Sequence, residues 1–194
     1  MKKLFDLLFS FIGLVIFSPL FLIISIAIKF SSKGKIFFKQ KRIGIGYKEF
    51  TIYKFRTMHE NSGGIQLTTK NDDRVTSVGK FLRKFKLDEL PQLINVLIGN
   101  MSFVGPRPEV KKYADRYKEN EKQVFNLKPG ITDYASIKFI NENELLDGKE
   151  DPEKFYLEEI VPKKVKINLD YAKDANVFKD IVVIFKTIFR VIGN

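Results

Sequence analysis

The sequence contains no cysteine and a single histidine, His59, among its 194 residues. The absence of cysteine excludes disulfide bonds and thiol chemistry, and one histidine cannot build a zinc site of the usual histidine and cysteine type. Because the chain has no thiol, reducing and oxidising compartments are both compatible with it. His59 stands at the edge of a polar stretch, so we expect a surface residue rather than a catalytic base.

Acidic residues are scarce in the first third of the chain. Residues 1–60 hold 11 Lys and Arg against 3 Asp and Glu, a net charge of +8, whereas residues 61–194 hold 23 against 20, a net charge of +3. A total of +11 suits either a nucleic acid or an anionic membrane surface as the partner. Because the positive charge flanks the longest apolar segment, we expect membrane lipid as the partner and no nucleic acid.

This apolar segment covers residues 7–28, which are 22 residues without a charge. As a helix it would be about 33 Å long, at about 1.5 Å per residue, which is enough to span a bilayer. The run is longer than the apolar part of a secretory signal peptide, and no clear small-residue cleavage site follows it. We therefore expect the segment to remain in the mature protein.

Ser18 and Pro19 interrupt the segment near its middle. Pro19 cannot donate to the carbonyl of Val15, which kinks or breaks a helix, while the Ser18 hydroxyl can satisfy a freed carbonyl. A kinked spanning helix is one interpretation, but lysines flank both ends, and a spanning segment normally keeps its positive excess on one side. A helix-break-helix that enters and leaves on one face explains both features. The residues alone leave the two topologies open.

Residues 36–58 contain two strand-like runs rich in Phe, Ile, Tyr and Thr, which meet at the Gly-Ile-Gly of residues 44–46. This pattern predicts a β-hairpin. The two glycines could instead cradle a phosphate, but without the rest of a fingerprint a turn is the stronger interpretation. Residues 59–73 are polar, and we expect a mobile loop there.

Three later stretches have apolar residues at helical spacing. The first covers residues 87–97, and because proline is tolerated in a first turn, this helix should begin only a few residues before Pro91. Residues 109–125 predict a second amphipathic helix whose apolar stripe lies in the core. Residues 177–192 predict a third, which either lies in the membrane interface or packs onto the domain. Residues 141–152 are acidic and polar and predict a loop.

The first of these helices begins with a carboxylate pair, Asp88 and Glu89. Taken alone, such a pair is usually a cap that complements the helix dipole. Cations surround it in the sequence, namely Lys54, Arg56, Arg74, Arg83 and Arg107. Guanidinium groups bind phosphate bidentately and a carboxylate pair can hold Mg²⁺ through hard oxygen ligands, so this set suits a phosphorylated substrate.

Pro106 and Pro108 fix the backbone on both sides of Arg107. A cation held in this way can bind an anion with little loss of conformational entropy. An ordinary proline-rich turn is the alternative that these three residues leave open.

Several strings resemble those of one family, in the same order along the chain. They are the apolar segment with Ser18 and Pro19, then FFKQKRIG, IYKFRTM, DDRVTSVGKFLR, LDELPQLINVLIGNMSFVGPRP and KPGIT, with a looser match through Tyr171, Asp180 and Thr187. On these motifs the chain resembles the bacterial sugar transferases, also called monotopic phosphoglycosyl transferases, over nearly its whole length. LDELPQ followed by GPRP at this distance is highly specific.

We therefore expect an α+β fold in two parts. Residues 1–30 should form a re-entrant membrane helix-break-helix, which the resemblance favours over a spanning helix. Residues 31–194 should form a small, mostly helical catalytic domain on the cytoplasmic face, with a short β-hairpin and interfacial amphipathic helices.

The resemblance also implies an activity. Members of the family transfer a phospho-sugar from a UDP-sugar to polyprenol (undecaprenyl) phosphate at the cytoplasmic face of the bacterial inner membrane, release UMP, and so begin the assembly of a glycan such as O-antigen, capsule, exopolysaccharide or glycoprotein. Asp88 would be the nucleophile that forms a phosphosugar-aspartate, and Glu89 would bind Mg²⁺. The phosphates would bind to Lys54, Arg56, Arg83 and Arg107. The rival expectation is a non-catalytic basic adaptor at the membrane surface, and the sequence leaves the sugar and a homo-oligomer open.

One departure from the family pattern concerns the residues after KPGIT. Many members continue with Gly-Trp-Ala-Gln and then a Gly-Arg pair, whereas residues 133–140 read DYASIKFI. The arginine that contacts phosphate in those members is therefore missing, with Ile140 near its place. Either Lys138 substitutes for it or this part of the site is built differently.

Overall fold

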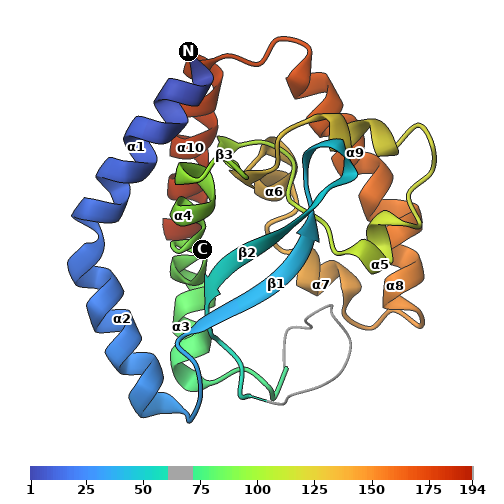
Figure 1. Cartoon of the computed structure of the whole chain (residues 1–194). Coiled ribbons are helices and arrows are strands. Elements are labelled where there is room, and N and C mark those ends of the chain that lie inside the picture. Colours follow the sequence, from blue (N-terminus) through green and yellow to red (C-terminus); the bar gives the residue numbers. More distant parts are fainter. Residues whose placement is uncertain (61–71, 194) are drawn as a thin grey trace.

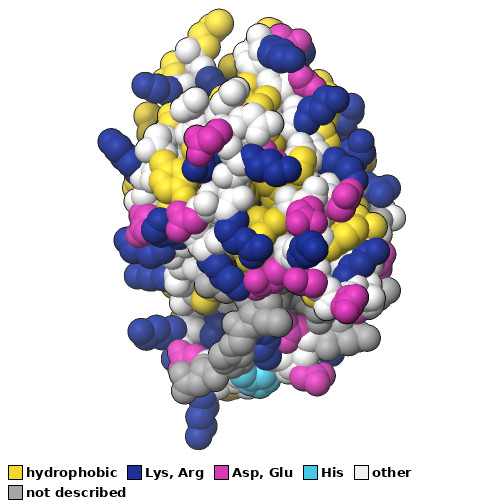
Figure 2. Space-filling model, turned by 90° about the vertical axis from the view of Figure 1, so that its right-hand side faces the viewer, with side chains coloured by type: hydrophobic (Ala, Val, Ile, Leu, Met, Phe, Trp, Pro, Cys, Tyr) yellow, Lys and Arg dark blue, Asp and Glu magenta, His cyan; other side chains and the backbone are white. Residues whose placement is uncertain are grey.

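The computed structural model of the chain describes residues 1–60 and 72–193. Within these residues it combines helices with two small two-stranded sheets, which confirms the predicted mixture of helix and sheet. Figure 1 shows two N-terminal helices along one edge of the molecule, a two-stranded hairpin across its middle, and shorter helices on the other side. Figure 2 shows that this other side carries many lysine, arginine and acidic side chains.

The apolar segment forms two helices, α1 (Lys2–Ile16) and α2 (Ser18–Ser31), with a bend of 59° between them. The Ser18 hydroxyl donates to the carbonyl of Val15 at 2.8 Å, in place of the N–H that Pro19 lacks. The predicted helix break is therefore confirmed. Among the described helices, none has by itself the length and hydropathy to cross a bilayer, whereas the bent pair meets both requirements when its halves are taken together.

Both N-terminal helices pack against the rest of the protein on one side only. α1 lies along α4 (Gln92–Leu97), and α2 contributes Ile24 and Ile28 to a core cluster with Phe55 and Leu82. Their other sides expose large apolar side chains, among them Leu4, Leu7, Leu8, Phe11, Val15, Ile16, Leu22, Ile23, Ile26 and Phe30. The pair therefore presents an apolar surface that the described residues leave uncovered.

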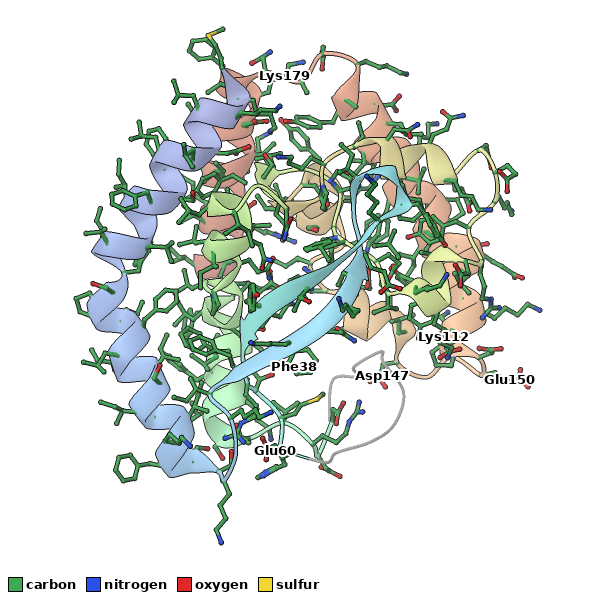
Figure 3. All side chains as sticks on the ribbon, viewed as in Figure 1. Phe38, Glu60, Lys112, Asp147, Glu150 and Lys179 are labelled. Carbon is green, nitrogen blue, oxygen red and sulfur yellow. The ribbon has the colours of Figure 1, made fainter. Side chains whose placement is uncertain are left out.

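The expected C-terminal helix is α10 (Val177–Ile192), which lies beside the start of α1 and begins near the labelled Lys179 in Figure 3. Its buried side carries Asp180 and Val183, and Asp180 pairs with Lys2 of α1. Its apolar side is exposed, with Phe178 at 83%. The predicted packing of this helix onto the domain is therefore confirmed for one side, which contacts β3, β4 and α6, and its placement in the membrane interface stays a prediction.

Strands β1 (Phe37–Ile43) and β2 (Glu49–Phe55) pair antiparallel, and a 3₁₀ turn, η1 (Ile45–Tyr47), joins them. The predicted hairpin is confirmed, and so is the turn at residues 44–46. Gly46 adopts a φ of +65°, in the left-handed region that glycine enters without a steric penalty.

The helix predicted over residues 87–97 is interrupted. It begins as a 3₁₀ turn, η2 (Leu87–Glu89), and becomes the α-helix α4 only after Pro91. In and just after this turn, backbone N–H groups bond to carbonyls three residues earlier. Pro91 has no N–H to donate, so the tight turn opens into a regular helix only beyond it. Asp88 and Glu89 therefore lie in a turn before the helix rather than in its first turn.

Residues 109–125 do not form one helix, so this prediction is wrong. The structure has a short helix, α5 (Lys111–Ala114), and a separate 3₁₀ helix, η3 (Lys122–Asn126). The polar run KENEK at 118–122 offers no apolar side chain with which a continuous helix could face the core. The apolar residues around it are nevertheless buried as predicted, namely Val110, Tyr113, Val124 and Phe125.

The two predicted loops have different outcomes. Residues 141–152 contain a helix, α7 (Glu142–Leu146), so the loop prediction is wrong there. The helix is explained by Leu146, which is 2% exposed and packs in the core. Residues 61–71 of the other predicted loop lie outside the described residues, and His59 beside them is exposed as expected.

The remaining elements complete the side of the molecule away from α1 and α2 (Figure 1). Strands β3 (Ser102–Val104) and β4 (Gly130–Thr132) pair in parallel. They are followed by α6 (Tyr134–Lys138), α8 (Pro152–Phe155), the π-helical turn η4 (Tyr156–Ile160) and α9 (Val161–Ala172).

Helix α3 (Ser77–Lys84) approaches the end of β2 closely at Gly79, where a Cβ would lie 2.1 Å from the carbonyl oxygen of Thr57. Because the atom in the way is backbone, we expect Gly79→Ala to lower the free energy of unfolding by about 1–3 kcal/mol. Urea unfolding in detergent micelles measures this change. Ser77→Ala, at an exposed position of the same helix, should change it by less than about 0.5 kcal/mol. Equal stabilities of the two variants would contradict the close approach.

Candidate active site

The predicted site residues meet in a cleft with a volume of about 1590 Å³. Its walls come from the β1–β2 hairpin, α3 with η2, residues 106–109, and helices α6, α7 and α9. Phe38 and Glu60, labelled in Figure 3, belong to its lining on the hairpin side. The lining includes every predicted carboxylate and cation and the two prolines, namely Lys54, Arg56, Arg74, Arg83, Asp88, Glu89, Pro106, Arg107 and Pro108. Ser18 and Pro19 lie at the helix break and do not line it.

Glu89 is the centre of charge pairing in the cleft. Its Oε1 accepts from Lys54 Nζ at 2.7 Å and from Arg107 Nη2 at 3.0 Å, and the residue is only 8% exposed. Burial alone would raise the pKa of Glu89, but the positive charges of Arg107 and Lys54 outweigh burial and hold the pKa well below its usual value. Glu89 is therefore ionised throughout the physiological pH range.

Asp88 is equally buried, at 8% exposed, but is not paired in the same way. Among the described residues, its Oδ1 has no hydrogen-bond partner. Burial raises the pKa of Asp88 above its usual value, against the opposing effect of the Lys54 charge. An unsatisfied buried acceptor costs about 1–3 kcal/mol, so this oxygen is expected to find its partner in a ligand.

The carboxylate pair fits Mg²⁺ if the substrate completes the ion's coordination. Mg²⁺ is commonly held by one or two carboxylates together with substrate phosphates and water. Within the part of the chain that the structure describes, no three acidic or histidine side chains converge. The protein alone would therefore not enclose the ion, and the unpartnered oxygen of Asp88 beside Glu89 is the observation that favours the fit.

Arg107 is positioned by its backbone as well as by its side chain. Its N–H donates to Asp133 Oδ2 at 3.0 Å, and the carbonyl of Pro106 accepts from Gly130 N at 3.0 Å. The carbonyl of Pro108 accepts from Arg42 Nη1 at 3.3 Å. The segment is therefore held on both sides of Arg107, in agreement with the anchored cation that the two prolines suggested.

Two further cations lie close to Asp88. Arg83, on α3, donates from Nε to the hydroxyl of Thr57 at 2.8 Å, and its charge acts on Asp88. Lys86, which the sequence analysis missed, lines the cleft and also acts on Asp88. Its φ of +56° is unusual for a residue with a side chain, and its place two residues before Asp88 was the available signal.

Arg56 lies in the cleft lining but is engaged elsewhere. Its Nη2 donates to the carbonyl of Ser32 at 2.8 Å and its Nη1 donates to the carbonyl of Lys33, so the guanidinium holds the end of α2. This contact joins the N-terminal helices to β2. The binding of phosphate by Arg56 stays a prediction, and its observed hydrogen bonds indicate a structural role.

The region of the missing family arginine is built differently. Ile140 lines the cleft, whereas Lys138 is exposed and does not. A different lysine, Lys164 of α9, contributes to the lining together with Glu142 and Asn168. The sequence analysis missed these three residues because nothing in the local sequence ties α7 and α9 to the carboxylate pair.

The buried carboxylate pair and its surrounding cations form a class of site whose charges suit a multiply charged anion, and it belongs to a protein with an exposed apolar surface on its N-terminal helices. The chain belongs to the bacterial sugar transferase family, whose sequence model matches residues 1–194. The predicted family resemblance is confirmed.

Curated relatives agree with this assignment. The chain is 39% identical, over 99% of its length, to the UDP-glucose:undecaprenyl-phosphate glucose-1-phosphate transferase of Xanthomonas campestris pv. campestris and covers 39% of that protein. It is 37% identical, over 96% of its length, to the UDP-N-acetylgalactosamine-undecaprenyl-phosphate N-acetylgalactosaminephosphotransferase of Aeromonas hydrophila and covers 42% of it. It is 35% identical, over 96% of its length, to the exopolysaccharide production protein ExoY of Rhizobium meliloti (strain 1021), of which it covers 83%. The chain thus spans about two fifths of the length of the first two relatives.

The contacts of Arg56 predict its effect on stability. We expect Arg56→Ala to lower the free energy of unfolding by about 1.5–3 kcal/mol, because two carbonyls at the end of α2 lose a charged donor. Arg56→Lys should recover less than half of this, since an ammonium group does not reproduce the guanidinium fork. Urea unfolding in detergent micelles is the measurement.

The control is Arg116→Ala, at an exposed position, which should change the free energy of unfolding by less than about 0.5 kcal/mol. If Arg56→Ala has the same free energy of unfolding as the unmodified protein, the contact with α2 does not stabilise the fold. Phosphate binding would then be the favoured role of Arg56.

Proposed function

We propose that this protein transfers a phospho-sugar from a UDP-sugar to polyprenol phosphate and releases UMP, at the cytoplasmic face of the bacterial inner membrane. Family membership and the names of the relatives support the reaction. The single observation that carries the proposal for this chain is Asp88, a buried carboxylate with an unpartnered oxygen in a cleft lined by cations.

The chemistry has two steps, both at the β-phosphorus of the donor. In the first, an oxygen of Asp88 bonds to the β-phosphorus. The bond between this phosphorus and the oxygen that bridges the two phosphates breaks, and UMP leaves with the electron pair of that bond. In the second, an oxygen of polyprenol phosphate bonds to the same phosphorus and the carboxylate leaves. The products are a polyprenol diphosphosugar and the restored aspartate.

The cations of the cleft address the main electrostatic difficulty of this reaction. An ionised aspartate needs no base in order to attack, but its charge is repelled by a diphosphate. Arg83 and Lys86 lie close enough to Asp88 for their charges to act on it, and Arg107 is fixed beside Glu89. Such groups offset the repulsion and stabilise the charge on the leaving UMP. Mg²⁺, when bound through Glu89, would supply further neutralisation of the diphosphate.

The membrane placement is supported by the exposed apolar surface of α1, α2 and α10. The 59° bend and the lysines on both flanks favour a re-entrant hairpin over a spanning segment. Arg56 ties the end of this hairpin to β2, the strand that carries Lys54. The depth of the hairpin therefore determines the height of the cleft relative to the lipid phosphates.

The rival function, a non-catalytic adaptor, would require the carboxylate pair to be a helix cap. A capping carboxylate accepts backbone N–H groups of the first turn. Instead, Glu89 accepts from two side-chain cations and Asp88 Oδ1 has no partner among the described residues. The observed contacts therefore favour the enzyme.

Replacing the nucleophile is the direct test. We expect Asp88→Asn to reduce Mg²⁺-dependent UMP release from a UDP-sugar by about 10³-fold or more, because an amide oxygen is a poor nucleophile. The measurement is UMP release in the presence of undecaprenyl phosphate, with a panel of UDP-sugars.

Asp170→Asn is the matched control, since Asp170 is exposed on α9 and forms an ion pair with Lys173, three residues later on the chain. It should retain activity within about twofold, and both variants should unfold at temperatures close to that of the unmodified protein. Normal turnover by a folded Asp88→Asn protein would remove Asp88 from the role of nucleophile, and absence of UMP release from every UDP-sugar by the unmodified protein would favour the adaptor.

The absence of cysteine makes the topology simple to test. Single cysteines at positions 3 and 33, in the variants Lys3→Cys and Lys33→Cys, can be labelled with a membrane-impermeant maleimide in inside-out and right-side-out vesicles. A re-entrant hairpin predicts that both are labelled from the cytoplasmic side. Labelling from opposite sides would contradict it and establish a spanning segment.

A further inference from the structure

A second group of polar side chains lines the cleft beyond Arg107. Lys164 and Asn168 are four residues apart on α9, so they lie on the same face of that helix, and both line the cleft. Glu142 of α7 pairs with Lys164. The activity proposed above uses none of these residues.

Asn168 has the environment of a ligand-binding residue. It is 4% exposed, and its side-chain oxygen Oδ1 has no hydrogen-bond partner among the described residues. A buried amide oxygen without a donor is unfavourable by about 1–3 kcal/mol. A ligand that donates a hydrogen bond to it would remove this cost.

The group is adjacent to the phosphate-binding part of the cleft. The charge of Glu142 acts on Arg107, and the charge of Lys164 acts on Asp133, which accepts the backbone N–H of Arg107. Arg107 therefore interacts directly with Glu89 of the carboxylate pair, and it lines the same cleft as Asn168 and Lys164. A substrate with a phosphate at Arg107 would therefore share the cleft with Asn168 and Lys164.

The chemistry of the group matches hydroxyls rather than a nucleobase. It combines a donor, the ammonium of Lys164, with acceptors on Glu142 and Asn168, and a sugar hydroxyl can both donate and accept. Lys164 Nζ lies over one face of each of two neighbouring rings, 6.0 Å from the ring centroid of Phe139 and 5.4 Å from that of Tyr156. Tyr156 is also only 6% exposed, so it offers little ring surface on which a base could stack.

We propose that Asn168 and Lys164, with Glu142, form the subsite for the sugar hydroxyls of the UDP-sugar, and that Asn168 helps to select the sugar. The proposal rests on the function proposed above. A buried group that must hydrogen-bond a substrate hydroxyl rejects donors that lack this hydroxyl far more strongly than an apolar pocket would. The relatives act on different sugars by name, glucose in one and N-acetylgalactosamine in another, so a residue that selects the sugar is required.

The test measures binding in the Asp88→Asn background, so that it does not depend on turnover. Calorimetry gives the Kd of UDP, UDP-glucose and UDP-N-acetylgalactosamine for the full chain in detergent. We expect Asn168→Leu to weaken binding of the tighter of the two UDP-sugars by about tenfold or more, the loss of one buried hydrogen bond, and to change the Kd of UDP by less than about twofold. Asn168→Asp keeps an acceptor oxygen at this position. In this variant the ratio of the Kd values of the two UDP-sugars should stay within about threefold of the ratio measured with Asn168.

Lys164→Met and Lys163→Met form a matched pair, because Lys163 is exposed on the same helix. The first should weaken UDP-sugar binding selectively, and the second should leave every Kd unchanged. If the variants lose equal affinity for UDP and for the UDP-sugars, the uridine binds here and the proposal is overturned. If Asn168→Leu leaves the ratio of the Kd values of the two UDP-sugars unchanged, Asn168 is merely structural and the proposal is overturned as well. The proposal also fails if the Asp88→Asn protein, with no further substitution, binds both UDP-sugars with the same Kd as UDP.

Failure of the proposed function has a different signature. In that case the unmodified protein releases no UMP from any UDP-sugar, whatever the binding constants are. Selective binding lost in Asn168→Leu would then still support the subsite.

Discussion

The site depends on the ion pairs of Glu89. Its buried carboxylate joins η2 to Lys54, 35 residues earlier on β2, and to Arg107, 18 residues later. A single buried charge is unfavourable, but two cations within hydrogen-bond distance compensate for burial and keep Glu89 ionised. Loss of this carboxylate would leave the two cations without their hydrogen-bonded ion-pair partner, and breaking a buried pair in this way typically costs about 3–5 kcal/mol. Glu89 is therefore both the structural link of the cleft and the reason why its cations are already in place.

The remaining features follow from this arrangement. Lys54, Arg107, Glu89 and Asp88 together carry no net formal charge, so the charge of the proposed diphosphate substrate would have to be balanced by groups outside this set. The charges of Arg83 and Lys86 act on Asp88, so these two residues could supply such cations, and a divalent cation would add to them. The next residues of the chain after Lys54 connect the cleft to the apolar surface: Phe55 packs against Phe21 of α2, Arg56 holds the end of α2, and Thr57 accepts from Arg83. One short stretch of backbone thus fixes the cleft and the two N-terminal helices with their exposed apolar surface relative to each other.

The sequence predicted those features that depend on local physical chemistry. The helix break follows from Pro19 and the hairpin from alternating β-formers around a glycine turn, and the carboxylate pair with its cations was apparent from residue types and family motifs. Predictions that depended on tertiary contacts were less successful. The chain from 109 to 125 kept its apolar residues in the core without the continuous helix, and a short helix formed at α7 because Leu146 found a place in the core. Asn168 was missed because its significance lies in an unpartnered buried oxygen, which only packing creates.

The central claim, that Asp88 attacks the donor phosphorus, is tested most directly by the mass of the intact protein after incubation with a UDP-sugar and Mg²⁺ in the absence of polyprenol phosphate. The first step can then proceed and the second cannot. We expect a species heavier by one phosphosugar, with the modification located on Asp88 by peptide mapping and discharged when polyprenol phosphate is added. UMP formation in step with acceptor turnover, without any such species even on rapid quenching, would contradict a covalent aspartate intermediate and favour direct transfer between the two substrates.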